Sequence, residues 1–229
     1  MIGYHHTKVG YLRVRPMPNF KANADRMVDR QLRKRGMRDE AVLAAMLSVP
    51  RHEFVDETLI GSAYDDRALP TAHGQTISQP YIVGKMTEML QVGFSQRVLE
   101  VGTGSGYQAA ILAQLGAQVM SIEFQPELAQ NAQSRLKRLG YQVDVLVGDG
   151  TLGWPERAPF NRIIVTAAAP NLPPSLTEQL SDGGRIVIPL GTQTLQHLTL
   201  LVRSGGVWSQ EQHTACRFVP LVGKHGWEA

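Results

Sequence analysis

The chain has 229 residues, of which 43% are apolar and 19% charged, a composition ordinary for a globular protein that folds without disulfides or metal ions. Its single cysteine, Cys216, excludes an intramolecular disulfide and a multi-cysteine zinc site, and fits a reducing compartment. The net charge is +3, but residues 1–24 hold four bases and no acid, which leaves 19 bases against 20 acids in the remainder. The basic pI of about 9.1 therefore gives little support to a nucleic-acid partner.

Residues 1–24 are interpreted as a basic, loose tail. Lys8, Arg13 and Arg15 interrupt any apolar core of a signal peptide, and no apolar run approaches the roughly 18 residues of a membrane span. We expect a cytoplasmic protein that does not bind membranes, with a transit peptide as the alternative interpretation of the tail. The remainder, 25–229, is expected to form one domain.

The first part of that domain, 25–96, is expected to be a helical front followed by a loop. Residues 24–60 have apolar residues at helical spacing, Asp39 is a suitable N-cap, and Pro50 ends the pattern. Residues 61–78 have the Gly, Pro, Asp and Ser content of a loop. Pro80 suits the first turn of a further helix.

The second part, 97–229, alternates strands and helices. This alternation predicts an α/β fold, Rossmann-like, with a mostly parallel sheet and helices on both faces. The last strand-like runs, 207–222, are expected to add antiparallel edge strands. Strands are predicted at 97–101, 118–123, 143–147, 162–166, 185–189 and 198–203, and helices at 107–115, 127–139 and 175–180.

A glycine-rich loop, Gly102-Thr103-Gly104-Ser105-Gly106, lies between the first of these strands and its helix. Ligands of parallel sheets bind at the carboxyl ends of strands, and glycine lets the backbone approach a ligand closely. A dinucleotide loop has the spacing G-x-G-x-x-G, which argues against a dehydrogenase. The G-x-G-x-G form after Glu100 resembles the first motif of S-adenosylmethionine-dependent methyltransferases. Glu100 is expected to orient the loop backbone rather than to contact the ligand.

Two acidic residues follow at the ends of the next strands. Glu123 can accept hydrogen bonds from both ribose hydroxyls, and Asp149 can accept one from the exocyclic amine of an adenine. The simpler interpretations are a solvated acid for Glu123 and a turn residue for Asp149. We predict a site for S-adenosylmethionine, with S-adenosylhomocysteine as product and no metal, formed by Gly102, Thr103, Gly104, Ser105, Gly106, Glu123, Asp149, Gly150, Gln79 and Pro80.

The loop before Pro80 carries a more specific signal. Its segment 74–83, GQTISQPYIV, resembles the signature of the protein-L-isoaspartate O-methyltransferase family. Further matches are AAAP at 167–170, GGR at 183–185 and FVPL at 218–221, so that the similarity runs from about Asp25 to Val222. The chain departs from the family at 68–72, where ALPTA replaces the usual Pro-Leu-Pro-Ile-Gly. This difference affects the expected stiffness of the loop and the substrate preference, not the reaction.

The resemblance implies transfer of a methyl group from S-adenosylmethionine to the free carboxylate of L-isoaspartyl residues in damaged proteins and peptides. It implies that Ser78 is the active-site residue, although Ser78 could also cap the helix beginning near Pro80. His73 is expected to be structural. The substrate peptide is expected to lie extended across the loop, with 218–222 as part of its groove. The expected substrate-binding residues are Thr76, Ile77, Val219 and Pro220.

The chemistry of this loop agrees with a carboxylate acceptor. A carboxyl group with a pKa near 4 is already ionised at pH 7, so its methylation needs no general base. The segment 64–86 offers hydroxyls, Gln75 and a single histidine, and no catalytic dyad. The alternatives are a methyltransferase for small molecules or nucleic acid, which the charge of the body argues against, and a cofactor-binding regulator without turnover.

Overall fold

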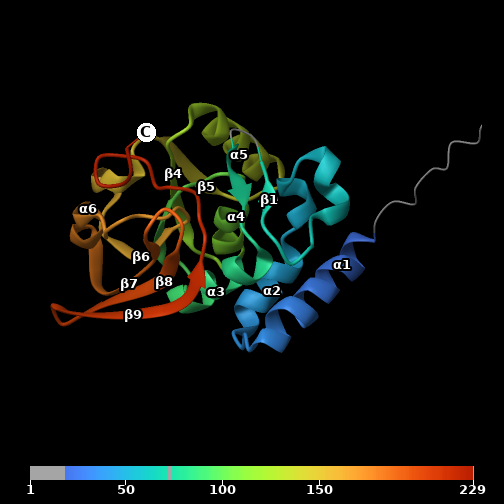
Figure 1. Ribbon diagram of the computed structural model, residues 1–229, viewed down its shortest axis with the longest axis horizontal. Helices are drawn as coiled ribbons and strands as arrows, with labels where there is room; N and C mark the ends of the chain where they lie inside the picture. The colour runs from blue at the N-terminus through green and yellow to red at the C-terminus, as the bar shows by residue number, and fades with distance from the viewer. Residues whose placement is uncertain (1–18, 72–73, 229) are drawn as a thin grey trace, which may run out of the picture.

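The computed structural model describes residues 19–71 and 74–228 and contains one seven-stranded sheet (Figure 1). The strand order is β5-β4-β3-β6-β7-β8-β9. The first five strands in this order are parallel, and β8 and β9 add antiparallel strands at one edge. The strands are β3 (Arg97–Val101), β4 (Gln118–Glu123), β5 (Val143–Val147), β6 (Phe160–Val165), β7 (Leu180–Gly191), β8 (Gln196–Ser204) and β9 (Val207–Cys216).

The predicted fold class is confirmed, because each predicted strand has its counterpart in the sheet. Two boundaries differ. Strand β7 begins at Leu180, so the predicted helix 175–180 is shortened to α6 (Pro174–Glu178). The predicted C-terminal strand region 207–222 divides into β9 and an irregular segment that pairs only through isolated bridges such as that of Ala168 with Pro220.

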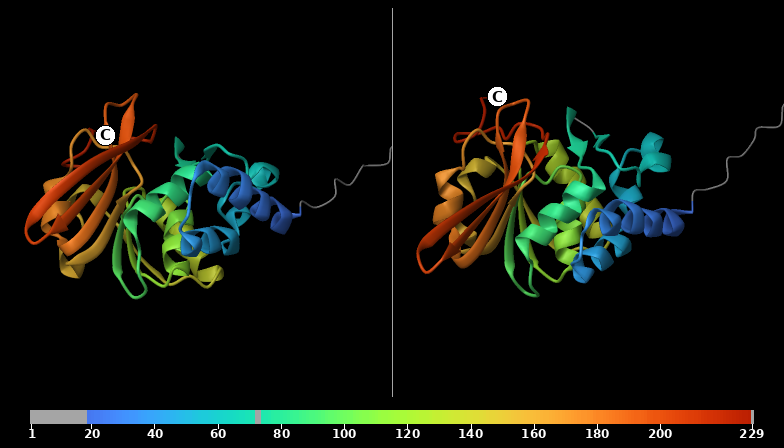
Figure 2. Two further views of the ribbon diagram at one scale, coloured as in Figure 1. Left: turned by 90° about the horizontal axis from the view of Figure 1, so that it is seen from below. Right: turned by 60° about the horizontal axis from the view of Figure 1, so that its bottom comes forward.

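The sheet separates two hydrophobic cores, because successive residues of a strand point to opposite faces. On β3, Val98 belongs to the core beneath the helical front, whereas Leu99 and Val101 belong to the core beneath α6. Figures 1 and 2 show the helical front on one side of the molecule and α6 on the other. The helices besides α6 are α1 (Phe20–Met27), α2 (Glu40–Ser48), α3 (Pro80–Leu90), α4 (Tyr107–Gln114) and α5 (Pro126–Arg138).

The helical front is less continuous than its apolar spacing predicts. Helix α1 continues through further helical turns to Arg35, and Gly36, in the left-handed region with φ of 91°, ends it. Asp39 caps α2 as predicted, because its carboxylate accepts hydrogen bonds from the amides of Ala41 and Val42. Between Pro50 and Ala63 the chain forms short 3-10 turns, at Arg51–Phe54 and Glu57–Ser62.

The predicted loop 61–78 contains a small ladder. Strand β1 (Leu69–Pro70) pairs antiparallel with β2 (Thr76–Ile77), and Leu69 and Ile77 are both buried. This ladder fixes the course of the chain into Ser78 and α3.

The helical front begins earlier in the chain than the sequence indicates. Helix α1 begins at Phe20, inside the stretch interpreted as a tail, and residues 1–18 lie outside the described residues. Within 19–71 and 74–228, no helix is long and apolar enough to cross a membrane.

Candidate active site

A cavity of about 960 Å³, including its opening to solvent, lies at the carboxyl ends of β3, β4 and β6. The glycine loop after β3, the end of β4, the residue after β6 and the segment 219–222 form its walls. Among the lining residues within the described parts of the chain, Glu123 alone is charged. The cavity is lined by the predicted residues Gly102, Thr103, Gly104, Ser105, Glu123, Gly150, Thr76, Ile77, Ser78, Val219 and Pro220.

The glycine loop needs glycine at Gly102 and Gly104 for different reasons. Gly102 has a φ of 96°, and a β-carbon there would lie 2.5 Å from Oγ1 of Thr166. The Thr166 hydroxyl donates to the carbonyls of Gly102 and Val101, at 2.6 and 3.1 Å. Gly104 has a φ of 51°, and a β-carbon there would meet no protein atom within 4 Å. The loop is therefore packed tightly at Gly102 and open at Gly104.

Glu123 joins the glycine loop to the end of β4. Its side chain accepts hydrogen bonds from the amide of Gly104 at Oε2 and from the amide of Gln125 at Oε1, at 2.8 and 3.0 Å. The residue is 7% exposed and lines the cavity. Each carboxylate oxygen has a further lone pair, so both can still accept a hydroxyl of a ligand.

Glu100 acts on the loop through other side chains, as its position before the first glycine predicts. It is fully buried, Ser121 donates to its Oε2 at 2.5 Å, and Ser121 lies 2.6 Å from the hydroxyl of Thr103. Oε1 of Glu100 has no hydrogen-bond partner among the described residues. Burial, together with the neighbouring charge of Glu123, raises the pKa of Glu100 to about 8.

The substitution Glu100→Gln is expected to change how stability depends on pH. An unfolded glutamate ionises near 4.5, whereas native Glu100 keeps its proton to about 8, so the native state binds the extra proton between these values. Wild-type stability therefore falls as the pH rises through this window, by a term on the order of 5 kcal/mol. Thermal unfolding should show that the stability of the glutamine variant, relative to the wild type, is higher at pH 8.5 than at pH 5. An equal difference at both values would contradict the buried, protonated carboxyl.

Asp149 lies beside the cavity rather than on its wall. Its Oδ1 accepts from the amide and hydroxyl of Thr151, and its Oδ2 accepts from the amide of Lys224 at 2.8 Å. Asp149 thus fastens the C-terminal turn, residues 221–227, whose Leu221 and Val222 line the cavity. A β-carbon on Gly150 would lie 2.4 Å from Val101, so this glycine allows close packing of the protein itself. Direct contact of Asp149 with an adenine amine stays a prediction.

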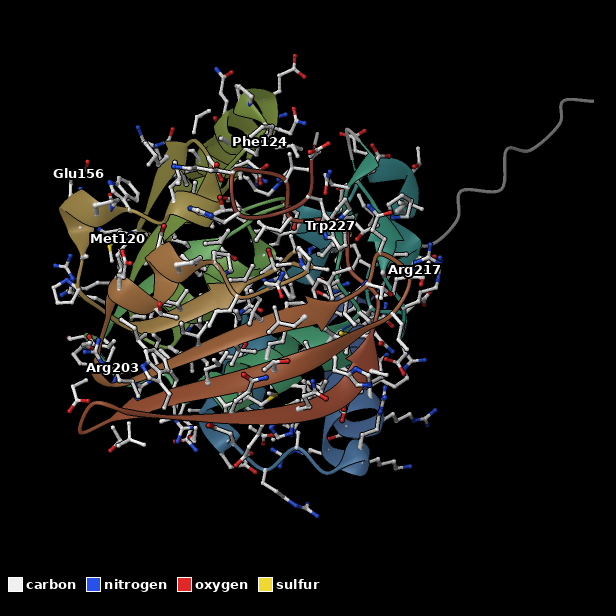
Figure 3. The ribbon with its side chains drawn as sticks, turned by 60° about the vertical axis from the view of Figure 1, so that its left-hand side comes forward. Met120, Phe124, Glu156, Arg203, Arg217 and Trp227 are labelled. Atoms are coloured by element: carbon white, nitrogen blue, oxygen red, sulfur yellow. The ribbon has the colours of Figure 1, made fainter. Side chains whose placement is uncertain are left out.

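A second space, the groove, adjoins the cavity. It is lined from β9 and its continuation by Cys216, Arg217 and Phe218, and from the loop side by Ala68 and Gln79. Figure 3 shows Arg217 next to the end of β9. The two spaces share the residues Thr76, Ser78, Thr166 and Val219.

Ser78 therefore lies where the cavity meets the groove. Its half-buried side chain makes no hydrogen bond among the described residues, and the N-cap of α3 is Gln79, without a side-chain capping bond. The alternative interpretation of Ser78 as a helix cap is thus not realised. The Ser78 carbonyl accepts a hydrogen bond of 2.8 Å from Arg51.

Three other predicted cofactor residues lie off the cavity wall. Gln79 lines the groove and donates to the Asp66 side chain at 2.7 Å. Pro80 is buried at the first position of α3, and Gly106, with φ of 87°, precedes α4. Their contact with a cofactor stays a prediction. His73 and the replaced loop position Ala72 lie outside the described residues.

Cys216 is half-buried, packs against the core beneath the helical front, and lines the groove. Burial raises the pKa of its thiol to about 11, so the thiol is protonated at neutral pH.

Two functional candidates escaped the sequence analysis. Thr166 lines both spaces and holds the glycine loop through Gly102; its place as the last residue of a predicted strand was the available signal. Phe124 lines the cavity next to Glu123 and is 45% exposed (Figure 3). An exposed aromatic ring at a strand end offers a stacking surface for a planar ligand.

Comparisons with known proteins agree with this geometry. The family model for protein-L-isoaspartate(D-aspartate) O-methyltransferase (PCMT) matches residues 22–226. Protein-L-isoaspartate O-methyltransferase 1 of Syntrophobacter fumaroxidans is 51% identical over 214 residues, covering 93% of this chain and 100% of that protein. Protein-L-isoaspartate O-methyltransferase 2 of Pelobacter propionicus is 53% identical over 204 residues, covering 88% and 91% of the two chains.

Solved structures share the fold. A protein-L-isoaspartate O-methyltransferase matches with a TM-score of 0.79 and 27% identity, over 88% of this chain and 66% of its own. A beta-aspartate methyltransferase (PCMT) of Plasmodium falciparum, in complex with S-adenosyl-L-homocysteine, has a TM-score of 0.76 and 24% identity, over 90% of this chain and 99% of its own. Because the family model spans most of the sequence and relatives about half identical cover nearly all of it, this chain belongs to the protein-L-isoaspartate O-methyltransferase family.

Proposed function

We propose that this chain moves a methyl group from S-adenosylmethionine to the carboxylate of L-isoaspartyl residues in damaged proteins and peptides, giving a methyl ester and S-adenosylhomocysteine. The cavity holds the cofactor and the groove holds the peptide. The observation that carries this assignment is the position of Ser78 at the junction of the two spaces. A transfer reaction requires its two reactants to meet at such a junction.

The residues of the cavity fit S-adenosylmethionine. Glu123 has lone pairs available for ribose hydroxyls, and the backbone at Gly104 leaves space for a close approach. The only charge on the described wall is negative, which suits a cationic sulfonium better than a phosphate-bearing cofactor. Phe124 offers its ring to a planar base. We assign residues 102–105, together with Glu123 and Gly150, to the cofactor site.

Ser78 orients the acceptor in this proposal. When bound, S-adenosylmethionine supplies a methyl group on a positively charged sulfur as the electrophile. The Ser78 hydroxyl donates to one carboxylate oxygen and turns the other toward the cavity. No residue needs to remove a proton, because the carboxylate is already ionised at neutral pH. Thr76, Ile77, Val219 and Pro220 exclude water, so the opposite charges meet without a solvent layer that favours their separation.

Backbone recognition suits the groove. A repair enzyme meets isoaspartyl residues in many sequence contexts, and hydrogen bonds to an extended peptide backbone tolerate such variation. The groove is bordered by the end of β9 and by the β1–β2 ladder, both extended segments. We further propose that the protein acts in the cytoplasm, on proteins rather than on nucleic acid. The net charge of −1 for 25–229 supports the protein substrate, because phosphate backbones select basic surfaces.

The test uses paired peptides. The protein is incubated with methyl-labelled S-adenosylmethionine and with peptides that differ only in one isoaspartyl or aspartyl residue. We expect base-labile methyl ester on the isoaspartyl peptide alone. Cofactor binding without transfer would instead favour a regulator, and equal labelling of both peptides would contradict isoaspartyl recognition.

Val219→Asp is expected to raise the KM for the peptide. Val219 lines both spaces, so a carboxylate there would repel the substrate carboxylate while leaving the attraction of a cationic cofactor intact. Two like charges about 4 Å apart repel by about 1 kcal/mol in water and by about 4 kcal/mol near a protein surface, so KM should rise by at least about fivefold. Val219→Asn has the same shape without the charge and is the matched control. Equal KM values for the two variants would show that Val219 does not face the substrate carboxylate.

A further inference from the structure

Arg51 is a fully buried arginine beside Ser78. It follows Pro50 at the start of the 3-10 turn Arg51–Phe54, and its exposed fraction is 0%. Its Nε donates to the carbonyl of Ala63 at 2.7 Å, and its Nη2 donates to the carbonyl of Ser78 at 2.8 Å. The guanidinium lies 4.8 Å from the ring centroid of Tyr107.

This arrangement is energetically demanding. Arg51 forms no ion pair with a carboxylate in the described residues, and its Nη1 has no hydrogen-bond partner there. Removing a cation from water without a counter-charge is unfavourable, and burial lowers the pKa of Arg51 accordingly. An aliphatic side chain would fill the same space at a lower desolvation cost. Stability of the core alone therefore does not explain an arginine at this position.

The three contacts of Arg51 join parts of the site that lie far apart in the sequence. Ala63 follows the 3-10 turn Glu57–Ser62 of the helical front. Ser78 belongs to the loop that borders the groove. Tyr107 is the first residue of α4, directly after the glycine loop, and lines the cavity. One rigid, planar guanidinium thus sets the spacing between the acceptor loop and the cofactor loop.

We propose that Arg51 is a positioning residue, which holds the backbone of Ser78 at the distance from the glycine loop that in-line methyl transfer requires. This inference rests on the proposed function. Methyl transfer depends mainly on the alignment of the attacking oxygen, the methyl carbon and the sulfur, and small displacements of positioned groups slow such reactions strongly. Because Arg51 touches neither space directly, its loss should change kcat more than the affinity for cofactor or peptide.

The experiment compares Arg51→Lys and Arg51→Gln with Arg203→Lys as a matched control. Arg203 also donates to a backbone carbonyl, that of Leu180, lies near an aromatic ring, that of Trp208, and has a buried Nε without a partner among the described residues. It sits on β8 at the opposite end of the β8–β9 hairpin from Arg217 (Figure 3). The readouts are kcat and KM for an isoaspartyl peptide, the Kd of S-adenosylhomocysteine, and Tm. Measurements at 10 °C with saturating cofactor keep the variants folded, because a bound ligand stabilises the native state.

We expect both Arg51 variants to lose at least tenfold in kcat, with Kd and KM within threefold of the wild type. A lysine keeps the charge but its single ammonium group cannot reach both carbonyls, so it should not restore activity. Arg203→Lys should lower Tm without changing kcat. The proposal is overturned if Arg51→Lys keeps wild-type kcat, or if Arg203→Lys loses as much kcat as the Arg51 variants. A wild-type protein inactive on the isoaspartyl peptide would instead contradict the proposed function.

Discussion

Ser78→Ala is expected to lower kcat on an isoaspartyl peptide by about 100-fold while the Kd of S-adenosylhomocysteine stays within threefold of the wild type. A hydrogen bond to a charged group contributes about 1.5–3 kcal/mol, and here the same bond also selects the reactive oxygen. The Ser78 hydroxyl makes no hydrogen bond among the described residues, so its removal leaves no protein group unpaired. Steady-state kinetics and calorimetry of the variant would measure the two quantities separately.

Ser48→Ala is a suitable control for this experiment. Ser48 lies on the exposed side of α2, and its hydroxyl donates to the Ala44 carbonyl, away from both spaces. Its loss should leave kcat and Kd unchanged. Full activity of Ser78→Ala would remove the hydroxyl from the mechanism, and a large loss of cofactor affinity would move Ser78 from the acceptor to the cofactor side.

The parallel sheet and the glycine loop could be predicted because both depend on local features of the chain. Strands β3, β4 and β5 are short runs that end at or just before Gly102, Glu123 and Gly148, and parallel strands bring such ends to one edge of the sheet. Gly102, Gly104 and Gly106 all have positive φ, as the G-x-G-x-G pattern implies. A side chain at these positions would strain the backbone, so the glycine pattern predicts the conformation of the loop directly.

The remaining features depend on contacts between distant segments. Asp149 resembles a ligand acceptor in the sequence, but Lys224, 75 positions later, takes up one of its oxygens. Arg51 has the appearance of an ordinary surface base after a proline, and only its contacts with Ala63 and Ser78 reveal a buried role. Neither set of contacts follows a periodicity or a fixed spacing in the sequence, so it could not be predicted from sequence patterns.

Gly102→Ala is expected to lower the stability of the protein by at least about 2 kcal/mol and to abolish cofactor binding. A left-handed backbone costs a non-glycine residue roughly 1–3 kcal/mol. The added methyl group would also approach Thr166 to 2.5 Å, which forces the threonine to leave the carbonyls of Gly102 and Val101. For a chain of this length the Tm should fall by more than about 5 °C. Thermal unfolding with and without S-adenosylhomocysteine measures both effects.

The variant Gly104→Ala tests whether the cofactor approaches the loop closely, because it adds a methyl group there with little strain in the unliganded protein. Its φ of 51° is accessible to alanine at a cost of about 1 kcal/mol, and the methyl group meets no protein atom within 4 Å. The unliganded variant should therefore unfold close to the wild-type Tm, yet lose the Tm increase that S-adenosylhomocysteine produces, because the methyl group enters the space assigned to the cofactor. If Gly104→Ala keeps the full ligand-induced increase, the cofactor does not approach the loop there. If Gly102→Ala is as stable as Gly104→Ala, then Thr166 does not hold the loop as its two hydrogen bonds indicate.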